Sequence, residues 1–270
     1  MNEPVIKRLF LLIALCVGII ILFPIIPSQD PLAINLDNKL LAPSAQHLLG
    51  TDELGRDLLS RLLAGVSSTL SVSLAALIVS AFVGIVMGAL AGYHHKRWFD
   101  TLFVGVTNFL SSLPALLIVA AVLGVWGSSL VKAYIVLTAL MWVAPGRIMR
   151  AEAIRESRLD YVLATRALGA NDSYIIFKII LPNCMSGALL FSLSYFPEII
   201  ALEAGLSFLG FGIQPPQPSL GRMIFDGVGQ LYAAWWMAFF PALALTLIVV
   251  AATLIGSSKS REKSDGQRDR

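Results

Sequence analysis

The sequence predicts an all-α integral membrane protein with six transmembrane helices and both termini in the cytoplasm. Three observations predict this fold class: a very apolar composition, six apolar segments of about bilayer length, and an uneven distribution of Lys and Arg along the chain. Hydrophobic residues make up 57% of the 270 residues and charged residues only 14%, whereas soluble domains carry about 25% charged residues. The mean hydropathy of +0.78 agrees with a chain that lies mostly in lipid.

A helix needs about 20 mostly apolar residues to cross the hydrocarbon core of a bilayer. The first such segment follows Lys7 and Arg8, as the apolar core of a signal peptide also does. It is longer than the usual core of about 7–15 residues, and no small-x-small cleavage site follows Pro24 and Pro27, so we interpret it as a retained span. The six expected spans are residues 9–27, 69–93, 102–126, 130–146, 183–204 and 234–256.

The basic residues predict the orientation of these spans. When residues 1–8 are placed inside, the cytoplasmic segments hold 15 of the 20 Lys and Arg residues, five of them in the tail 257–270, and the opposite side holds the other five. Lys and Arg gather on the cytoplasmic side of membrane proteins, so residues 1–8 and the tail are expected to be cytoplasmic. The net charge of +3 has the same origin and indicates no nucleic acid partner.

Residues 28–68 are expected on the periplasmic side, and they contain a cluster of acids. Asp52, Glu53 and Asp57 lie within six residues, a density also found in metal sites. An amphipathic helix is the stronger interpretation, because Thr51 or Asp52 is a suitable N-cap and acids suit a first turn. The apolar stripe of that helix, which is expected to lie on the outer membrane surface, comprises Leu54, Leu58, Leu59, Leu62 and Leu63.

Three glycines recur at intervals of four residues in the second span, at Gly84, Gly88 and Gly92. They share one helix face, and small residues at this spacing let another helix approach closely. The approaching helix belongs either to this chain or to a partner, and the sequence leaves the two alternatives open.

The longest polar connection between spans is residues 147–182, which we call the elbow. It is too long for a simple turn, and it begins with four arginines interleaved with three acids at spacings that allow helical ion pairs. Two short helices are expected to meet at Gly169, where a residue without a Cβ permits a sharp turn. Asn171 or Asp172 is expected to cap the second helix, which is expected to end before Pro182. An elbow that projects into the cytoplasm predicts a docking surface.

Two carboxylates fall within the fifth span. A charge in mid-bilayer costs roughly 2.5–3.5 kcal/mol on insertion scales, so such a residue usually faces protein or a water-filled path. Glu203 lies near the outer end, within reach of the membrane interface, and Glu198 lies deeper. Glu198 is consistent with lining of a translocation path, with proton coupling, or with a hydrogen bond inside the bundle.

The sequence contains no recognisable catalytic motif. The phosphate-binding loop G-x-x-x-x-G-K-[ST] is absent, so the chain is not expected to hydrolyse ATP. The motifs H-E-x-x-H and G-x-S-x-G are absent as well. We expect no catalytic residue, no metal site and no cofactor bound by this chain, and we expect His94 and His95 to be solvated.

Three motifs in order along the chain resemble the permease subunits of ABC importers in the dipeptide, oligopeptide and nickel family. They are the element His47–Asp57 (HLLGTDELGRD), the cytoplasmic run 158–183, and the stretch 203–212 (EAGLSFLGFG). The first is similar to the corresponding element of the C-type permease of such importers. The resemblance covers nearly the whole chain, from about residue 41 to residue 241.

The resemblance implies a transporter subunit without an ATPase site of its own, in the inner membrane of a bacterium. It implies a second permease subunit that forms a pseudo-twofold heterodimer, two ATPase subunits that use ATP, and an external substrate-binding protein. Di- or oligopeptides are the expected substrates. The elbow residues that the resemblance assigns to contact with an ATPase are Tyr161, Ala164, Arg166, Ala167, Gly169, Ala170 and Pro182.

Three departures from the family pattern concern the path and the tail. Asn108 stands where relatives commonly carry an acid, and Glu198 is an extra carboxylate; with Glu203 they form the candidate translocation path. The chain continues after the sixth span with Gly256-Ser-Ser-Lys in place of the expected Gly-Asp-x-Leu-Arg-Asp. Two alternatives stay open: a nickel or metal-chelate permease of the same family, and a proton-coupled secondary transporter in which Glu198 is protonated.

Overall fold

A computed structural model describes residues 18, 29–127 and 129–257 of the chain. The first expected span, apart from Gly18, and the tail after Ser257 lie outside the described residues. Within these residues the chain is helical and forms no strand, apart from an isolated bridge between Thr51 and Asp57. The all-α prediction is therefore confirmed for the described part of the chain.

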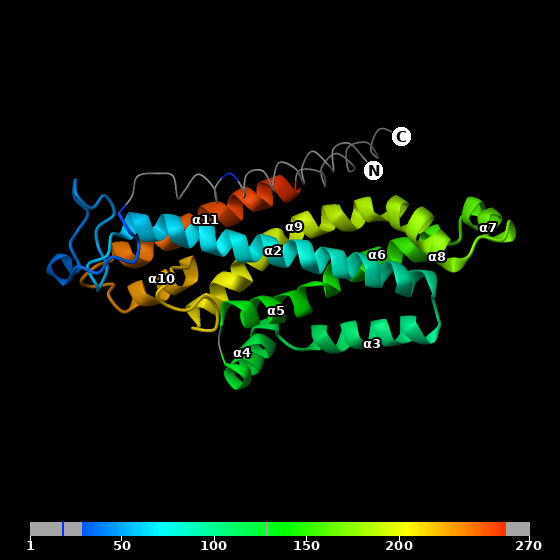
Figure 1. Ribbon diagram of the computed structural model, residues 1–270, viewed down its shortest axis with the longest axis horizontal. Coiled ribbons are helices and arrows are strands. Elements are labelled where there is room, and N and C mark those ends of the chain that lie inside the picture. The colour runs from blue at the N-terminus through cyan, green and yellow to red at the C-terminus, as the bar shows by residue number, and fades with distance from the viewer. Residues whose placement is uncertain (1–17, 19–28, 128, 258–270) are drawn as a thin grey trace, which may run out of the picture.

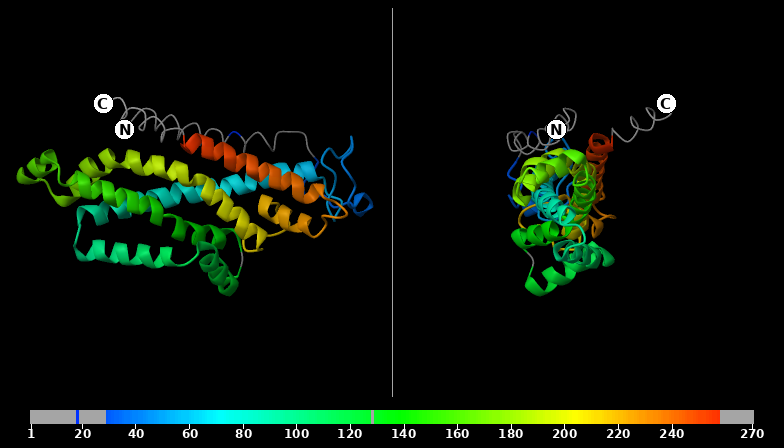
Figure 2. Two further views of the ribbon diagram at one scale, coloured as in Figure 1. Left: turned by 180° about the vertical axis from the view of Figure 1, so that it is seen from behind. Right: turned by 90° about the vertical axis from the view of Figure 1, so that its right-hand side faces the viewer.

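The helices lie mostly along one long axis, with α2, α6 and α9 side by side in the bundle (Figure 1). α3 and α4 lie along one side of it in both views of Figure 2. The helices are α2 (Leu58–Tyr93), α3 (Trp98–Ser112), α4 (Ala115–Trp126), α5 (Leu130–Met141), α6 (Val143–Glu156), α7 (Asp160–Ala167), α8 (Asp172–Tyr174), α9 (Leu181–Phe208), α10 (Leu220–Val228) and α11 (Trp236–Ser257), with a 3-10 turn η2 (Leu36–Asn38) and a π-helix η3 (Ile175–Ile180).

Three described helices are long and apolar enough to cross a membrane: α2, the continuous stretch Asp172–Phe208, and α11. α3 and α4 pass the same test only as a pair, which is bent by 88°. The expected span over residues 102–126 is therefore not one continuous helix. Leu113 is extended before Pro114, which has no N–H to continue the helix, so the chain turns there.

The fourth expected span, residues 130–146, is divided between α5 and α6, which meet at Trp142. α6 does not end at Gly146 but continues to Glu156, so the first third of the elbow extends a helix of the bundle.

The predicted amphipathic surface helix is wrong. Residues 39–56 form turns and bends, and α2 begins at Leu58, where the Asp57 side chain accepts a hydrogen bond from Ser60 N. Gly50 and Gly55 have φ angles of +82° and +70°, a left-handed conformation that interrupts any helix there. Leu58 is buried rather than laid on a membrane surface. We call residues 29–57 the cap segment, and the end of the bundle that carries it the cap end.

The glycines at 84, 88 and 92 pack α2 against α6 of the same chain. A Cβ at Gly88 would lie 2.3 Å from the carbonyl oxygen of Gly146, and a Cβ at Gly92 would lie 2.5 Å from that of Arg150. The helix backbones are therefore almost in contact. This contact decides between the two alternatives in favour of packing within the chain.

Candidate functional site: the elbow and the cap cavity

The tip of the elbow, residues 160–171, consists of α7 and a sharp turn. α7 ends at Ala167, and Gly169 follows with a φ of +92°. Asn171 caps α8, because its Oδ1 accepts a hydrogen bond from Tyr174 N at 2.8 Å. The predicted meeting of two helices at Gly169 and the predicted cap are confirmed.

The second elbow helix was expected to end before Pro182, but it continues past this residue. α8, η3 and α9 form one continuous helical stretch from Asp172 to Phe208. Pro182 lies in the first turn of α9, directly after the π-helical turn, in which Leu181 N bonds to Ile176 O. Pro182 cannot donate a hydrogen bond, and the wider π-turn accommodates its ring without breaking the helix.

α7 is held against the bundle by one apolar and one polar contact. Val162 is fully buried in a cluster that includes Met149 and Ile175. The Tyr161 hydroxyl donates a hydrogen bond to Glu156 and accepts one from Asn183 Nδ2 at 3.0 Å. Partial burial, followed by the Glu156 carboxylate, raises the pKa of Tyr161, so its hydroxyl stays protonated and continues to donate.

The elbow also contacts the end of α2 through four residues that we call the Tyr93 cluster: Tyr93, His94, Arg166 and Asp172. The Tyr93 hydroxyl donates to Asp172 Oδ1 at 2.5 Å, and the Arg166 guanidinium lies 5.2 Å from the centre of the Tyr93 ring. His94 Nε2 lies 3.9 Å from Asp172 Oδ2. The cluster connects the elbow with the C-terminal end of α2.

Sequence reasoning found Arg166 but missed Tyr93 and the part that His94 plays. An aromatic residue at the end of a span is a visible signal, but its partner Asp172 lies 79 positions away. Nothing in a single sequence pairs the two.

The elbow residues assigned to ATPase contact are accessible. Six of the seven have exposed or half-buried side chains on or beside α7, and Pro182 is exposed at the start of α9. Two leucines that the sequence analysis left out share this surface: Leu163 is 47% exposed and Leu168 is 89% exposed. The tip therefore presents apolar as well as basic side chains.

The three candidate path residues do not come together in the described structure, since no hydrogen bond or ion pair joins any two of them. Asn108 is exposed on α3 and accepts a hydrogen bond from Arg147 Nη2 at 3.1 Å. Glu198 is exposed on α9. Glu203 is buried, and its Oε1 accepts a hydrogen bond from Ser207 at 2.7 Å. The expectation that Glu203 reaches the membrane interface is therefore wrong.

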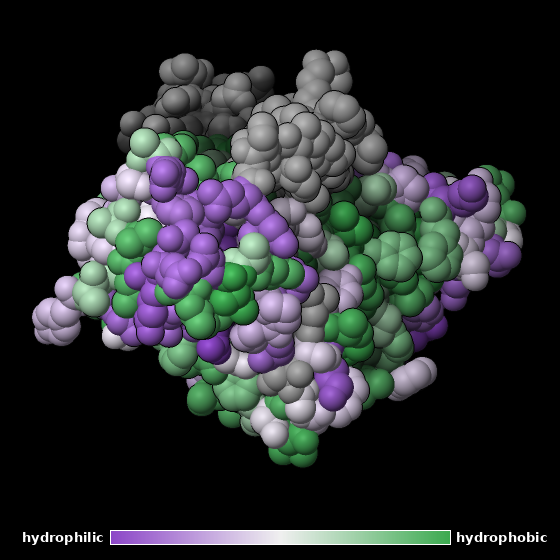
Figure 3. All heavy atoms as spheres, turned by 60° about the vertical axis from the view of Figure 1, so that its left-hand side comes forward, coloured by the Kyte–Doolittle hydropathy of each residue, from purple (hydrophilic) through white to green (hydrophobic). Residues whose placement is uncertain are grey.

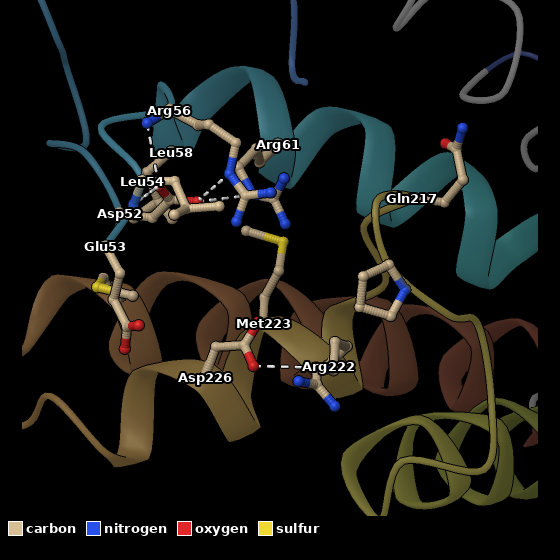
Figure 4. Close-up of a pocket in the computed structure, with 12 residues that line it drawn as sticks. Asp52, Glu53, Leu54, Arg56, Leu58, Arg61, Gln217, Arg222, Met223 and Asp226 are labelled. Atoms are coloured by element: carbon tan, nitrogen blue, oxygen red, sulfur yellow. Dashed lines mark hydrogen bonds and ion pairs between the residues drawn. The ribbon is translucent and has the colours of Figure 1, made fainter. Parts of the chain in front are cut away.

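A cavity of about 250 Å³ with charged side chains in its walls lies at the cap end, between residues 52–61 and α10 (Figure 4). On one wall, Asp52 Oδ2 accepts a hydrogen bond from Arg56 Nε at 2.7 Å and forms an ion pair with Arg61 Nε at 3.2 Å. On the other, Arg222 Nε lies 2.9 Å from Asp226. Burial raises the pKa of Asp226 more than the neighbouring arginines lower it.

The acids of the cap segment hold that segment in place. Asp57 Oδ1 is 3.0 Å from His47 Nδ1, and Glu53 accepts a hydrogen bond from Gln230 Nε2 at 2.9 Å. Trp236 Nε1 at the start of α11 donates to Thr51 O at 3.2 Å. Figure 3 shows hydrophilic residues gathered at this end of the molecule and hydrophobic surface along the flank behind it.

Comparison with known proteins identifies the family of this bundle. The family described as "Binding-protein-dependent transport system inner membrane component" matches residues 84–258, from the last third of α2 to the end of α11. The chain belongs to this permease family. It is therefore a multi-pass membrane component of a transport system, and the matched region contains the whole elbow.

Individual members of the permease family match over most of their length. The di/tripeptide transport system permease protein DppC of Pseudomonas aeruginosa is 35% identical over 252 residues, which are 91% of this chain and 80% of that protein. The glutathione transport system permease protein GsiD of Pectobacterium atrosepticum is 34% identical over 227 residues, 84% and 72% of the two chains. The oligopeptide transport system permease protein OppC of Bacillus subtilis is 31% identical over 259 residues, 96% and 82%.

Proposed function

We propose that this chain is the membrane-spanning permease subunit of an ATP-driven importer of di- or oligopeptides in a bacterial inner membrane. Relatives named for dipeptides, oligopeptides and the tripeptide glutathione support the substrate class. None of these three is named for nickel. The family description, a component of a binding-protein-dependent system, favours energy from partner subunits over proton coupling through Glu198.

The proposed assembly contains a second permease in a pseudo-twofold heterodimer, two ATPase subunits and an external substrate-binding protein. The chain itself binds no cofactor, and ATP is used by the ATPases. Six spans place both termini and the elbow in the cytoplasm and the cap segment in the periplasm. The elbow tip inserts into one ATPase, and closure of the ATP-bound ATPases then moves the spans as rigid bodies.

The exposure of Leu168 is the observation that carries the proposed docking of the elbow tip on an ATPase. The Leu168 side chain is 89% exposed at the turn of the elbow tip, and Leu163, five residues earlier on α7, is 47% exposed. α7 lies at the end of the molecule farthest from the cap segment (Figure 1). Exposed apolar side chains on a projecting segment are typical of a protein interface.

The test is a substitution of this leucine in the full transport complex. Leu168→Asp puts a charge into the proposed interface and should reduce co-purification of the ATPase about tenfold, the effect of about 1.4 kcal/mol on binding. Leu36→Asp is the matched control, because Leu36 is 65% exposed in the cap segment. It should leave the ATPase bound. Equal ATPase recovery with both variants would contradict docking through the elbow tip.

A second measurement tests the energy source. Proteoliposomes that enclose ATP and receive a labelled tripeptide with its binding protein should accumulate the peptide when a protonophore is present. Uptake that stops with the protonophore but continues without ATP would instead support the proton-coupled alternative through Glu198.

A further inference from the structure

A second cavity, of about 400 Å³, lies at the C-terminal end of α2, where the chain turns into α3. Its lining combines the apolar side chains of Leu90, Trp98 and Phe99 with the basic side chains of His94 and Arg97. It shares only His94 with the Tyr93 cluster. The cap cavity, by contrast, has a neutral lining in which arginines and acids are paired.

The turn beside this cavity carries uncompensated positive charge. Asp100, the acid nearest in sequence, is buried and already engaged by Arg150 Nε at 2.5 Å and by His95 Nδ1 at 2.9 Å. Lys96 and Arg97 are exposed, and no ion pair in the described part of the chain engages either side chain. The expectation that both histidines are simply solvated is also wrong, since each has a polar partner.

Trp98 begins α3, five residues after the last residue of α2. Its side chain is 75% exposed in the first turn after a span. Indole rings in this position lie at the level of lipid headgroups. Leu90 lies one turn before the end of α2, so the lining runs from an apolar side chain within this helix to the cations of the turn that follows it.

We propose that this cavity, which we call the α2–α3 site, binds the headgroup of an anionic phospholipid. Arg97, with Lys96 beside it, pairs with the phosphate, because an arginine fork matches phosphate oxygens bidentately. Leu90 and Phe99 contact the start of an acyl chain, and Trp98 lies against the glycerol. Basic pockets at the ends of membrane helices bind lipids of this class. The inference requires only that the chain spans a membrane and is independent of the transported substrate.

A free phosphate ion is an anion like a lipid headgroup, but it makes no contact with the apolar side chains of the lining. Three of the five lining side chains are apolar, and one of them, Leu90, belongs to α2, which is long and apolar enough to cross a membrane. The combination fits a molecule that is charged at one end and apolar at the other. The occupant is therefore a lipid.

Native mass spectrometry of the purified complex tests the site, with phosphatidylglycerol and phosphatidylethanolamine offered at equal concentration. The complex should retain phosphatidylglycerol preferentially, and Arg97→Gln should weaken this retention about fivefold, since one basic residue near a membrane surface contributes about 1 kcal/mol. Lys39→Gln removes one exposed cation from the cap segment and should change nothing. Equal retention of both lipids, or unchanged retention by Arg97→Gln, would overturn the proposal.

Two further measurements distinguish lipid binding at this site from misfolding of a variant and from binding of a simple anion. Brominated phosphatidylglycerol should quench the tryptophan fluorescence of the wild type more than that of Trp98→Phe, and equal quenching would contradict the site. Millimolar inorganic phosphate should not displace the lipid. Displacement by phosphate would show an anion site without lipid specificity and would also overturn the proposal.

Discussion

Tyr93 is the residue through which the elbow tip contacts α2. Its hydroxyl is shared with Asp172, whose side chain is 54% exposed, and its ring lies beside Arg166. Because the contact is largely in water, a hydrogen bond of this kind contributes only about 0.5–1.5 kcal/mol to stability. Its effect is therefore on the position of the elbow relative to α2 rather than on folding.

Tyr93→Phe removes the hydroxyl and keeps the ring that faces Arg166. We expect an assembled complex whose ATP hydrolysis continues while peptide uptake per ATP falls by up to about fivefold, the equivalent of one hydrogen bond of about 1 kcal/mol. Both rates are measured in proteoliposomes. Tyr232→Phe is the control, because Tyr232 is fully exposed in the loop after α10. The same uptake per ATP in both variants would exclude a part for the Tyr93 hydroxyl in coupling.

At this scale the sequence predicted residues that act through backbone geometry and missed residues that act through distant contacts. Gly169 and Asn171 were predictable, because a turn and a cap depend on neighbours in the chain. Glu203 was placed at the interface, yet it is buried and bonded to Ser207. Burial depends on helices that pack from elsewhere in the sequence, and periodicity in one span does not show them.

At the scale of the element, two prolines in apolar segments have opposite effects. Pro114 ends α3 and begins a bend of 88°, whereas Pro182 is carried within a continuous helical stretch behind a π-turn. Both geometries are compatible with proline, which has no N–H to donate to a helical hydrogen bond. Packing around η3, where Ile175 and Ile180 are fully buried, holds the helix together. Sequence alone gives the site of the disturbance but not its form.

The close approach of α2 and α6 gives a prediction at the same scale. Gly88→Ala places a methyl group 2.3 Å from the Gly146 carbonyl oxygen, and overpacking of this kind typically costs about 1–3 kcal/mol. The midpoint of thermal unfolding in detergent should fall by about 5 °C.

Gly105→Ala provides the matched control, because no described residue outside the local backbone of α3 lies within 4 Å of the new methyl group. Alanine favours a helix over glycine by about 1 kcal/mol, so this variant should melt at the same temperature or slightly higher. A similar fall in both variants would rule out the helix contact as the cause.

At the scale of the whole molecule, the cap segment and the elbow tip lie at opposite ends of the bundle (Figures 1 and 2). The proposed topology places these two ends on opposite sides of the membrane. The fold class and most of the long apolar helices were predictable, since composition and length determine them. The division of the third and fourth expected spans was not, because Pro114 marks the site of the first break but not its bend of 88°, and no special residue type marks the junction at Trp142.

Cysteine labelling tests the topology in intact cells. In a chain with Cys16→Ser and Cys184→Ser, a membrane-impermeant maleimide should label Tyr232→Cys from outside and Arg158→Cys only after permeabilisation. Both test positions are exposed in the structure. The reverse pattern would invert the orientation deduced from the basic residues, and labelling of both from outside would contradict the number of spans between them.

The length of α2 has a mechanical consequence. Its 36 residues extend about 54 Å at about 1.5 Å per residue, so the helix is a stiff lever nearly twice as long as the hydrocarbon core of about 30 Å is thick. If the Tyr93 end is held and the helix tilts by about 5°, its far end at Asp57 travels about 5 Å. A small tilt at the elbow thus becomes a larger displacement at the cap end of α2. There the contact between His47 and Asp57 transmits it to the cap segment.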